Sequence, residues 1–252
     1  MNRGTGQSLC RLCRSKPPDI KAHIMAEGLM KLVHGQSKYD GQFMMIGNGL
    51  RKPVRRPTGS YDRNILCAEC DNKLGKYDLA AIKFCKRNDF ESHPSGVASL
   101  LSRVDKASLK LFALSYIWRA SITQLSEYNM VSLGYKHESK IANMLRNNDA
   151  GGIDDYSVVM TRFNLPEERK MWGMHVLNPT TNRLDGINIV NVYLPNLYKW
   201  IVKVDSRPFG KTMHDMSLGA MDEALILDMG EYTNSQEFSF MHDAIMKMHG
   251  NK

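Results

Sequence analysis

The chain has 252 residues, of which 42% are hydrophobic, and a formal net charge of +8. This length accommodates one large domain or a small module joined to a larger one. No stretch approaches the roughly 18 apolar residues of a membrane span, and the polar, basic first residues lack the apolar segment of a secretory signal. We therefore expect a cytoplasmic protein with no membrane partner.

The positive charge is concentrated at the start of the chain. Residues 1–92 contain 17 Lys/Arg and 9 Asp/Glu, whereas residues 93–252 contain 17 of each. Arg51, Lys52, Arg55 and Arg56 fall within six residues of a proline-containing stretch. Such a cluster predicts an exposed loop that binds nucleic-acid phosphates, and a solubilising surface is the alternative.

Residues 1–92 carry all five cysteines, and four of them form two CxxC pairs, Cys10/Cys13 and Cys67/Cys70. This spacing is typical of a structural zinc site with four thiolate ligands. Disulfides are the weaker alternative, because nothing indicates an oxidising compartment. With zinc bound to four thiolates, this segment would still have a charge of +6 and would favour an anionic partner. Cys85 falls on the apolar face of a predicted helix after Cys70 and is expected to be a buried structural thiol.

The remaining elements predict an α+β fold. A short helix is expected over residues 24–33, and residues 92–96 are expected to be a linker. A helical hairpin follows over residues 98–147, with a buried helix over 98–125 and a shorter helix over 136–146. An antiparallel sheet is expected from runs over residues 156–163, 171–177, 186–194 and 198–204, with a further strand over 224–227. A C-terminal helix is expected from residue 234 or 235 to 249. The predicted domains are thus a zinc-binding module over 1–92 and an α+β domain over 93–252, with the sheet and last helix over 153–250.

His23 follows Cys13 by ten residues and precedes Ile24, and Asn64 precedes Cys67 by three residues. Together with the CxxC pairs, this pattern over residues 10 to about 78 resembles the cysteine-stapled HNH family of ββα-metal nucleases. The resemblance implies a small ββα module held by zinc at the four cysteines. In active members a second ion, often Mg²⁺, assists catalysis; here His23 would be the general base, Asn64 would orient it, and Asp71 would bind Mg²⁺ or Mn²⁺.

The chain departs from the pattern of active HNH members. The position before the histidine, where active members place a metal ligand, is occupied by Ala22. Asp71 alone is a weak site for a divalent ion. We therefore favour a module without catalytic activity.

A second block, Leu109 to Ser121 followed by Leu133 to Ile141, is similar to a "WRAS" helical block found after HNH-like zinc modules in uncharacterised bacterial and prophage-borne proteins. Arg119 in this block stands on a mostly apolar helix. We expect it either to reach the surface or to pair with an acid such as Glu138, and we favour the pair, because a buried guanidinium without a partner is costly.

Three functions are compatible with these patterns. The leading hypothesis is a zinc-stabilised, non-catalytic protein that binds nucleic acid or a nucleic-acid-binding protein through residues such as Arg51, Lys52, Arg55, Arg56 and Lys73. The prophage-borne relatives extend this hypothesis to interference with another phage's DNA metabolism, a form of phage defence. The alternatives are a metal-dependent HNH endonuclease that cuts DNA, and a protein inhibitor whose partner binds the C-terminal domain, where residues 222, 223, 228 and 231 are acidic. The oligomeric state is not predicted.

Overall fold

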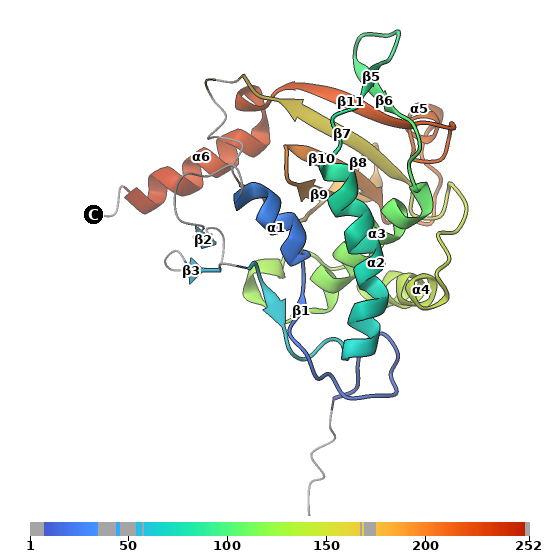
Figure 1. Ribbon diagram of the computed structural model, residues 1–252, viewed down its shortest axis with the longest axis vertical. Coiled ribbons are helices and arrows are strands. Elements are labelled where there is room, and N and C mark those ends of the chain that lie inside the picture. Colours follow the sequence, from blue (N-terminus) through green and yellow to red (C-terminus); the bar gives the residue numbers. More distant parts are fainter. Residues whose placement is uncertain are drawn as a thin grey trace, which may run out of the picture.

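The computed structural model describes residues 8–34, 44–45, 54–56, 58–166, 168 and 175–249. Its fold is α+β, as predicted (Figure 1). None of the helices in these described ranges has the length and apolarity needed to cross a bilayer. The helices are α1 (Glu27–His34), α2 (Ala68–Cys85), α3 (Lys106–Ile122), α4 (Gly134–Asn147), α5 (Lys211–Asp215) and α6 (Gln236–His249).

A seven-stranded sheet is built from strands between residues 91 and 231. Its spatial order is β5-β6-β11-β7-β10-β9-β8. The strands are β5 (Glu91–Ser92), β6 (Ala98–Leu101), β7 (Val158–Asn164), β8 (Thr180–Leu184), β9 (Ile187–Leu194), β10 (Tyr198–Lys203) and β11 (Ala224–Glu231). The prediction of an antiparallel sheet was wrong in one respect, because β11 runs parallel to β7. Because β10 is antiparallel to β7, the chain leaves β10 at the end of the sheet where β11 begins, and the connection that contains α5 only passes the end of β7.

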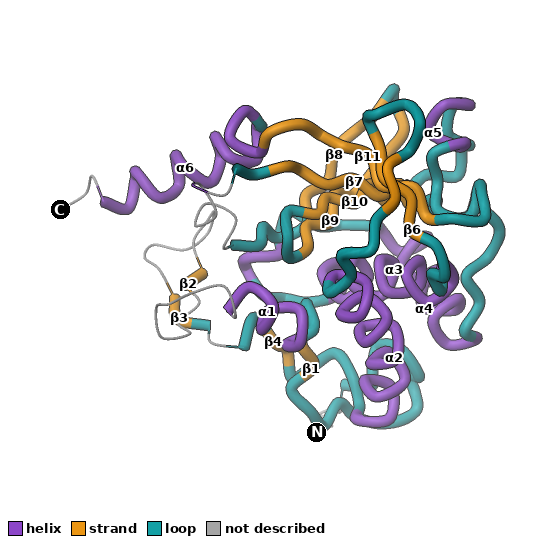
Figure 2. The backbone as a smooth tube through the Cα atoms, turned by 45° about the horizontal axis from the view of Figure 1, so that its top comes forward, coloured by secondary structure: helices purple, strands orange, loops and turns teal. Residues whose placement is uncertain are grey.

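The sheet separates two apolar layers of unequal size. Along β10, Trp200 and Val202 belong to the largest core cluster, whereas the intervening Ile201 packs on a smaller cluster around Phe209. Strands alternate their side chains between faces, so this pattern assigns each strand residue to a layer. Helices α2, α3 and α4 lie on the side of the larger cluster (Figure 2).

Helix α3 is the centre of the larger layer. All twelve residues from 109 to 120 are buried, which confirms the prediction of a buried helix here. It packs against both α2 and α4. The ring of Phe84 on α2 lies 5.2 Å from that of Trp200 on β10. Residues on both sides of position 92 therefore share one core, and the predicted domain boundary there stays a prediction.

Several predicted elements differ from the structure. The buried helix does not begin at Ala98, because residues 98–101 pair with β11 as strand β6. The helix begins at Lys106, where the carboxylate of Asp105 accepts a hydrogen bond of 3.0 Å from the backbone N–H of Ser108. The predicted linker is the turn between β5 and β6, which pair with each other.

The sheet prediction also failed around residues 171–184. Residues 171–174 lie outside the described part of the chain, and residues 175–177 are not in a strand. Strand β8 was missed, because its sequence Thr-Thr-Asn-Arg-Leu has only one apolar residue. It forms an exposed edge of the sheet, where polar residues are tolerated.

Two short antiparallel pairs lie in the N-terminal third. Strand β1 (Ala22–His23) pairs with β4 (Tyr61–Asp62), and β2 (Met44–Met45) pairs with β3 (Val54–Arg55). Helix α2 follows β4 directly and packs against α1 and α3. The order strand, strand, helix is present, and the specific ββα arrangement of HNH proteins stays a prediction.

Candidate metal centre

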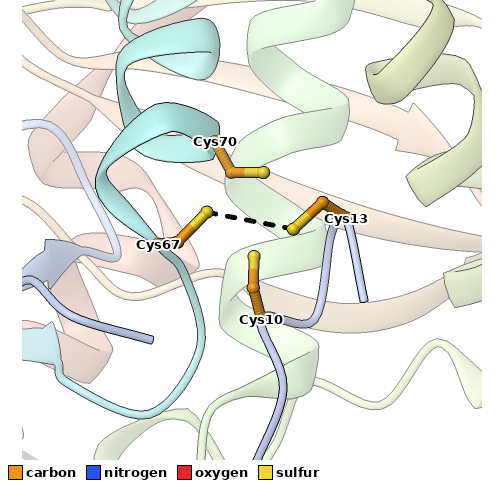
Figure 3. A group of neighbouring side chains, drawn as sticks. All are labelled: Cys10, Cys13, Cys67 and Cys70. Atoms are coloured by element: carbon orange, nitrogen blue, oxygen red, sulfur yellow. Dashed lines mark hydrogen bonds between the residues drawn. The ribbon is translucent and has the colours of Figure 1, made fainter. Parts of the chain in front are cut away.

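The four cysteines of the CxxC pairs converge on one point (Figure 3). Their sulfur atoms all lie within 4.8 Å of one another, and the Sγ atoms of Cys13 and Cys67 are 3.9 Å apart. A zinc ion with four sulfurs at about 2.3 Å in a tetrahedron requires sulfur–sulfur distances of about 3.8 Å. All four are free thiols, with no disulfide among them. The four thiols and their spacing therefore suit zinc, and the sulfur atoms would need to move only slightly closer together to bind it.

Local backbone structure presents the sulfurs. The first pair sits on a tight turn, closed by a hydrogen bond of 2.9 Å from the N–H of Arg14 to the carbonyl of Cys10. Arg14 has a φ of 56°, which turns the chain back after the second sulfur. The second pair brackets the start of α2, with Cys67 at the N-cap and Cys70 in the first turn. Negative thiolates are stabilised at this end of a helix, because its free N–H groups carry partial positive charge.

Two contacts hold the pairs against each other. The Asp19 carboxylate accepts a hydrogen bond of 2.6 Å from the N–H of Ala68, so a residue 49 positions earlier in the chain caps α2. Lys16, just after the first pair, forms an ion pair with Glu69 of the second. The cluster is thus built by two distant segments.

Two thiols of this cluster, Cys13 and Cys70, have pKa changes of opposite direction. Burial, together with the neighbouring thiols, raises the pKa of Cys70 well above its ordinary value. Burial also acts to raise the pKa of Cys13, but hydrogen bonds from Ser15 and from the Lys16 backbone outweigh it, and that pKa falls to about 6. Four thiolates at this spacing repel one another, so a cation is needed to hold them all deprotonated.

His23, the predicted general base, lies on β1 next to this module. It is half-buried, and its Nε2 atom is buried without a hydrogen-bond partner among the described residues. Burial is the main cause that lowers the pKa of its imidazole. Tyr61 on β4 is the residue paired with His23, and its ring packs edge-on against the imidazole with 6.0 Å between the ring centres. The lowered pKa favours the neutral form of the imidazole.

The other two predicted catalytic residues are placed differently. Asp71 is partly buried in the first turn of α2, and burial raises the pKa of its carboxyl. Asn64 is exposed, and its backbone N–H donates to the Asp62 carboxylate over 2.8 Å. In the part of the chain described, no hydrogen bond joins Asn64 to His23. The role of Asn64 in orienting His23 stays a prediction.

The prediction that Arg119 pairs with an acid is confirmed, but the partner is Asp78 and not Glu138, the acid named as an example. Its guanidinium is 1% exposed and contacts both carboxylate oxygens of Asp78, at 2.6 and 3.1 Å. It also donates to the carbonyl oxygen of His23 at 2.9 Å. Glu138 accepts a hydrogen bond from Ser121 at 2.6 Å. Asp78 is seven residues after Asp71, about two turns along the same face of α2.

These residues do not suit the second ion that the HNH resemblance implies. Among the described residues, the four cysteines are the only group of three or more side chains spaced to hold a metal. Asp78 is bound by Arg119, and an ion touching this carboxylate would lie within about 5 Å of a guanidinium that stays charged. Their repulsion would amount to several kcal/mol. We therefore derive no step through Mg²⁺ or Mn²⁺.

The residues predicted to bind nucleic acid are only partly described. Arg51 and Lys52 lie outside the described residues. Arg55 on β3 is exposed and Arg56 is half-buried. Lys73 on α2 is exposed, and its ammonium donates to the carbonyl of Arg146 at the end of α4. The structure thus assigns Lys73 a contact between helices that the sequence did not indicate.

Comparisons with protein-family models, with curated proteins and with solved structures found no match to this chain.

Proposed function

We propose that this protein is a zinc-stabilised, non-catalytic binding protein whose basic N-terminal segment contacts nucleic acid or a nucleoprotein. The observation that carries the proposal is the convergence of four cysteine sulfurs in the segment that holds all the excess positive charge. A structural zinc site creates a rigid scaffold and supplies no chemistry of its own when its four positions are filled by protein ligands. Zinc bound by Cys10, Cys13, Cys67 and Cys70 would hold the turn at residues 10–13 against the start of α2.

The absence of catalysis is supported by the surroundings of His23. A nuclease of the HNH type needs a metal ion beside its general base, and the position before His23 is Ala22. The acidic groups whose charge acts on His23 are Glu27, which pairs with Lys31, and Asp78, which is bound by Arg119. On the resemblance to prophage-borne proteins, we extend the proposal to interference with another phage's DNA metabolism.

Direct binding tests the leading proposal. Single- and double-stranded DNA are titrated with the zinc-loaded protein at 50 and 200 mM salt, and we expect affinity that falls steeply with salt. Arg55→Gln should reduce the slope of log affinity against log salt by about 1 if Arg55 contacts a phosphate. Arg183→Gln is the matched control, because Arg183 is an exposed arginine on β8, within residues 93–252, which have no net charge. Absence of salt-dependent binding would exclude nucleic acid as the direct ligand.

The second candidate is a metal-dependent endonuclease that uses His23, Asn64 and Asp71. The observation in its favour is the buried Nε2 atom of His23, which has no partner among the described residues and is chemically able to accept a proton. Wild type and His23→Ala are incubated with supercoiled plasmid and Mg²⁺ or Mn²⁺. Nicking by the wild type that His23→Ala lacks would replace the leading proposal, whereas equal and negligible nicking would remove this candidate.

The third candidate is a protein inhibitor that binds its partner through the C-terminal half. The exposed Asp222, two residues before β11, and the exposed Asp228, within β11, offer negative charge to a basic partner. Asp228 already accepts hydrogen bonds from Asn164 and from the N–H of Gly230, so it is fixed in place. A pull-down with wild type and an Asp222→Asn, Asp228→Asn double variant separates this function from the first, because only a partner of this surface would be lost.

A further inference from the structure

The polar groups between β1 and α2 are organised around one buried arginine, which comes from α3. Four contacts use its donors: the carbonyl of Ser115 at 3.3 Å, the carbonyl of His23 at 2.9 Å, and the two oxygens of Asp78. The guanidinium is 1% exposed, so these contacts are made almost without water. An arginine in this setting keeps its charge and a fixed geometry.

Arg119 puts a fixed positive charge between β1 and α2, the two elements that carry the residues to which the HNH resemblance gives a role beside the second ion. It touches β1 through His23, the proposed general base, and α2 through Asp78. Asp71 also interacts electrostatically with Arg119 and lies on the same face of α2. A positive charge bound to a carboxylate of the helix and close to the histidine strand is what a divalent ion would provide in an active member.

We propose that Arg119 is a built-in replacement for the second metal ion: its guanidinium neutralises Asp78, ties β1 to α2, and leaves no site for a divalent cation beside His23. This inference depends on the proposed HNH resemblance, which alone implies an ion there. It does not depend on nucleic-acid binding. Because α3 lies beyond residue 92, the proposal also means that a side chain of the predicted α+β domain (residues 93–252) completes the N-terminal module.

Two further hydrogen bonds join the chain after residue 92 to the segment that contains β4, which supports the view that this later part of the chain completes the N-terminal module. Thr123, just after α3, donates to the buried Asp62 carboxylate at 2.6 Å. Ser60 donates to Glu127 at 2.9 Å. Together with Arg119, they connect the C-terminal end of α3 and the residues just after it by hydrogen bonds to β1, β4 and α2. The hairpin would otherwise bury Asp62 with fewer partners, at a cost in free energy.

Manganese binding tests the replacement directly. Zinc-loaded wild type and Asp71→Asn are titrated with up to 1 mM Mn²⁺ while the six-line electron paramagnetic resonance signal of free Mn²⁺ is recorded. We expect the two proteins to leave the same free signal. One equivalent of Mn²⁺ bound by the wild type and lost in Asp71→Asn would overturn the proposal.

A stability measurement tests whether the guanidinium serves as the missing cation. Breaking a buried pair typically costs enough to lower the melting temperature of Arg119→Met by roughly 10 °C. If Arg119→Met does not fold, Arg119→Gln takes its place, because glutamine also removes the charge but keeps hydrogen-bond donors. We expect 1 mM Mn²⁺ to raise the melting temperature of the variant more than that of the wild type, because an added cation compensates the unpaired Asp78. An equal effect on both proteins would overturn the proposal.

A double-mutant cycle separates this proposal from the proposed function. Arg119→Met combined with Asp78→Leu removes both charges, and we expect the double variant to melt above the value predicted by adding the two single losses. Additive losses would contradict the pairing. None of these readouts involves nucleic acid, so failure to bind DNA would leave them unchanged.

Discussion

Replacing Cys70 by alanine tests the metal centre most sharply. Cys70 and Cys85 are both buried thiols on α2, but Cys70 belongs to the four-sulfur cluster and Cys85 does not. Cys85→Ala is therefore a control matched in residue type, helix and burial. The two variants remove the same atoms and differ only in the loss of a metal ligand.

The expected magnitudes are far apart. Zinc bound by four protein ligands contributes about 10–16 kcal/mol in small peptides, whereas the whole free energy of unfolding of a protein is about 5–15 kcal/mol. Cys10, Cys67 and Cys70 lie in the same core cluster as Leu66 and Leu74, so loss of zinc also loosens apolar packing. Even partial loss should unfold the N-terminal segment of Cys70→Ala. Cys85→Ala should cost about 1 kcal/mol.

The assay combines metal content with unfolding. Zinc is measured by mass spectrometry of the purified, reduced proteins, and stability by circular dichroism in urea. We expect one equivalent of zinc in the wild type and in Cys85→Ala, and a substoichiometric amount in Cys70→Ala. If Cys70→Ala retained a full equivalent and unfolded at the same urea concentration as Cys85→Ala, the argument for a structural zinc site would be refuted.

Two further predictions concern buried charged side chains in the part of the chain after residue 92. The ammonium of Lys110 is buried and donates to the carbonyl of Gly152 at 2.6 Å, and burial lowers its pKa to about 8. Because the unfolded chain keeps this proton to about pH 10.5, stability from Lys110 should rise by about 1 kcal/mol between pH 7 and 9. Urea unfolding of Lys110→Met should lack this rise, and an identical pH slope in both proteins would contradict it. The carboxylate of Glu237 on α6 pairs with Lys199 of β10 at 2.6 Å in a mostly buried setting. Glu237→Gln should therefore speed hydrogen exchange along α6 several-fold, whereas Asp243→Asn on the exposed side should not; equal rates in the two variants would show that the pair does not anchor the helix.

Local sequence patterns were sufficient for several features. The CxxC spacing predicted which four thiols meet, because a two-residue gap lets one turn present both sulfurs of a pair. The apolar sequence of residues 109–120 predicted a buried helix, and runs of β-branched residues predicted β7, β9, β10 and β11. These signals depend on neighbours within a few residues, so they persist whatever the rest of the chain does.

Features that depend on distant segments were decided only by the tertiary structure. Residues 98–101 fit the helical pattern that follows them, but backbone pairing with β11, more than 120 residues later, makes them a strand. The partner of Arg119 could not be chosen from sequence, since Asp78 and Glu138 are both acidic and both on helices. Packing of α3 against α2 brings Asp78 within 2.6 Å of the guanidinium, whereas Glu138 accepts a hydrogen bond from Ser121. A buried charge needs a partner, and only the arrangement of the helices determines which one is within reach.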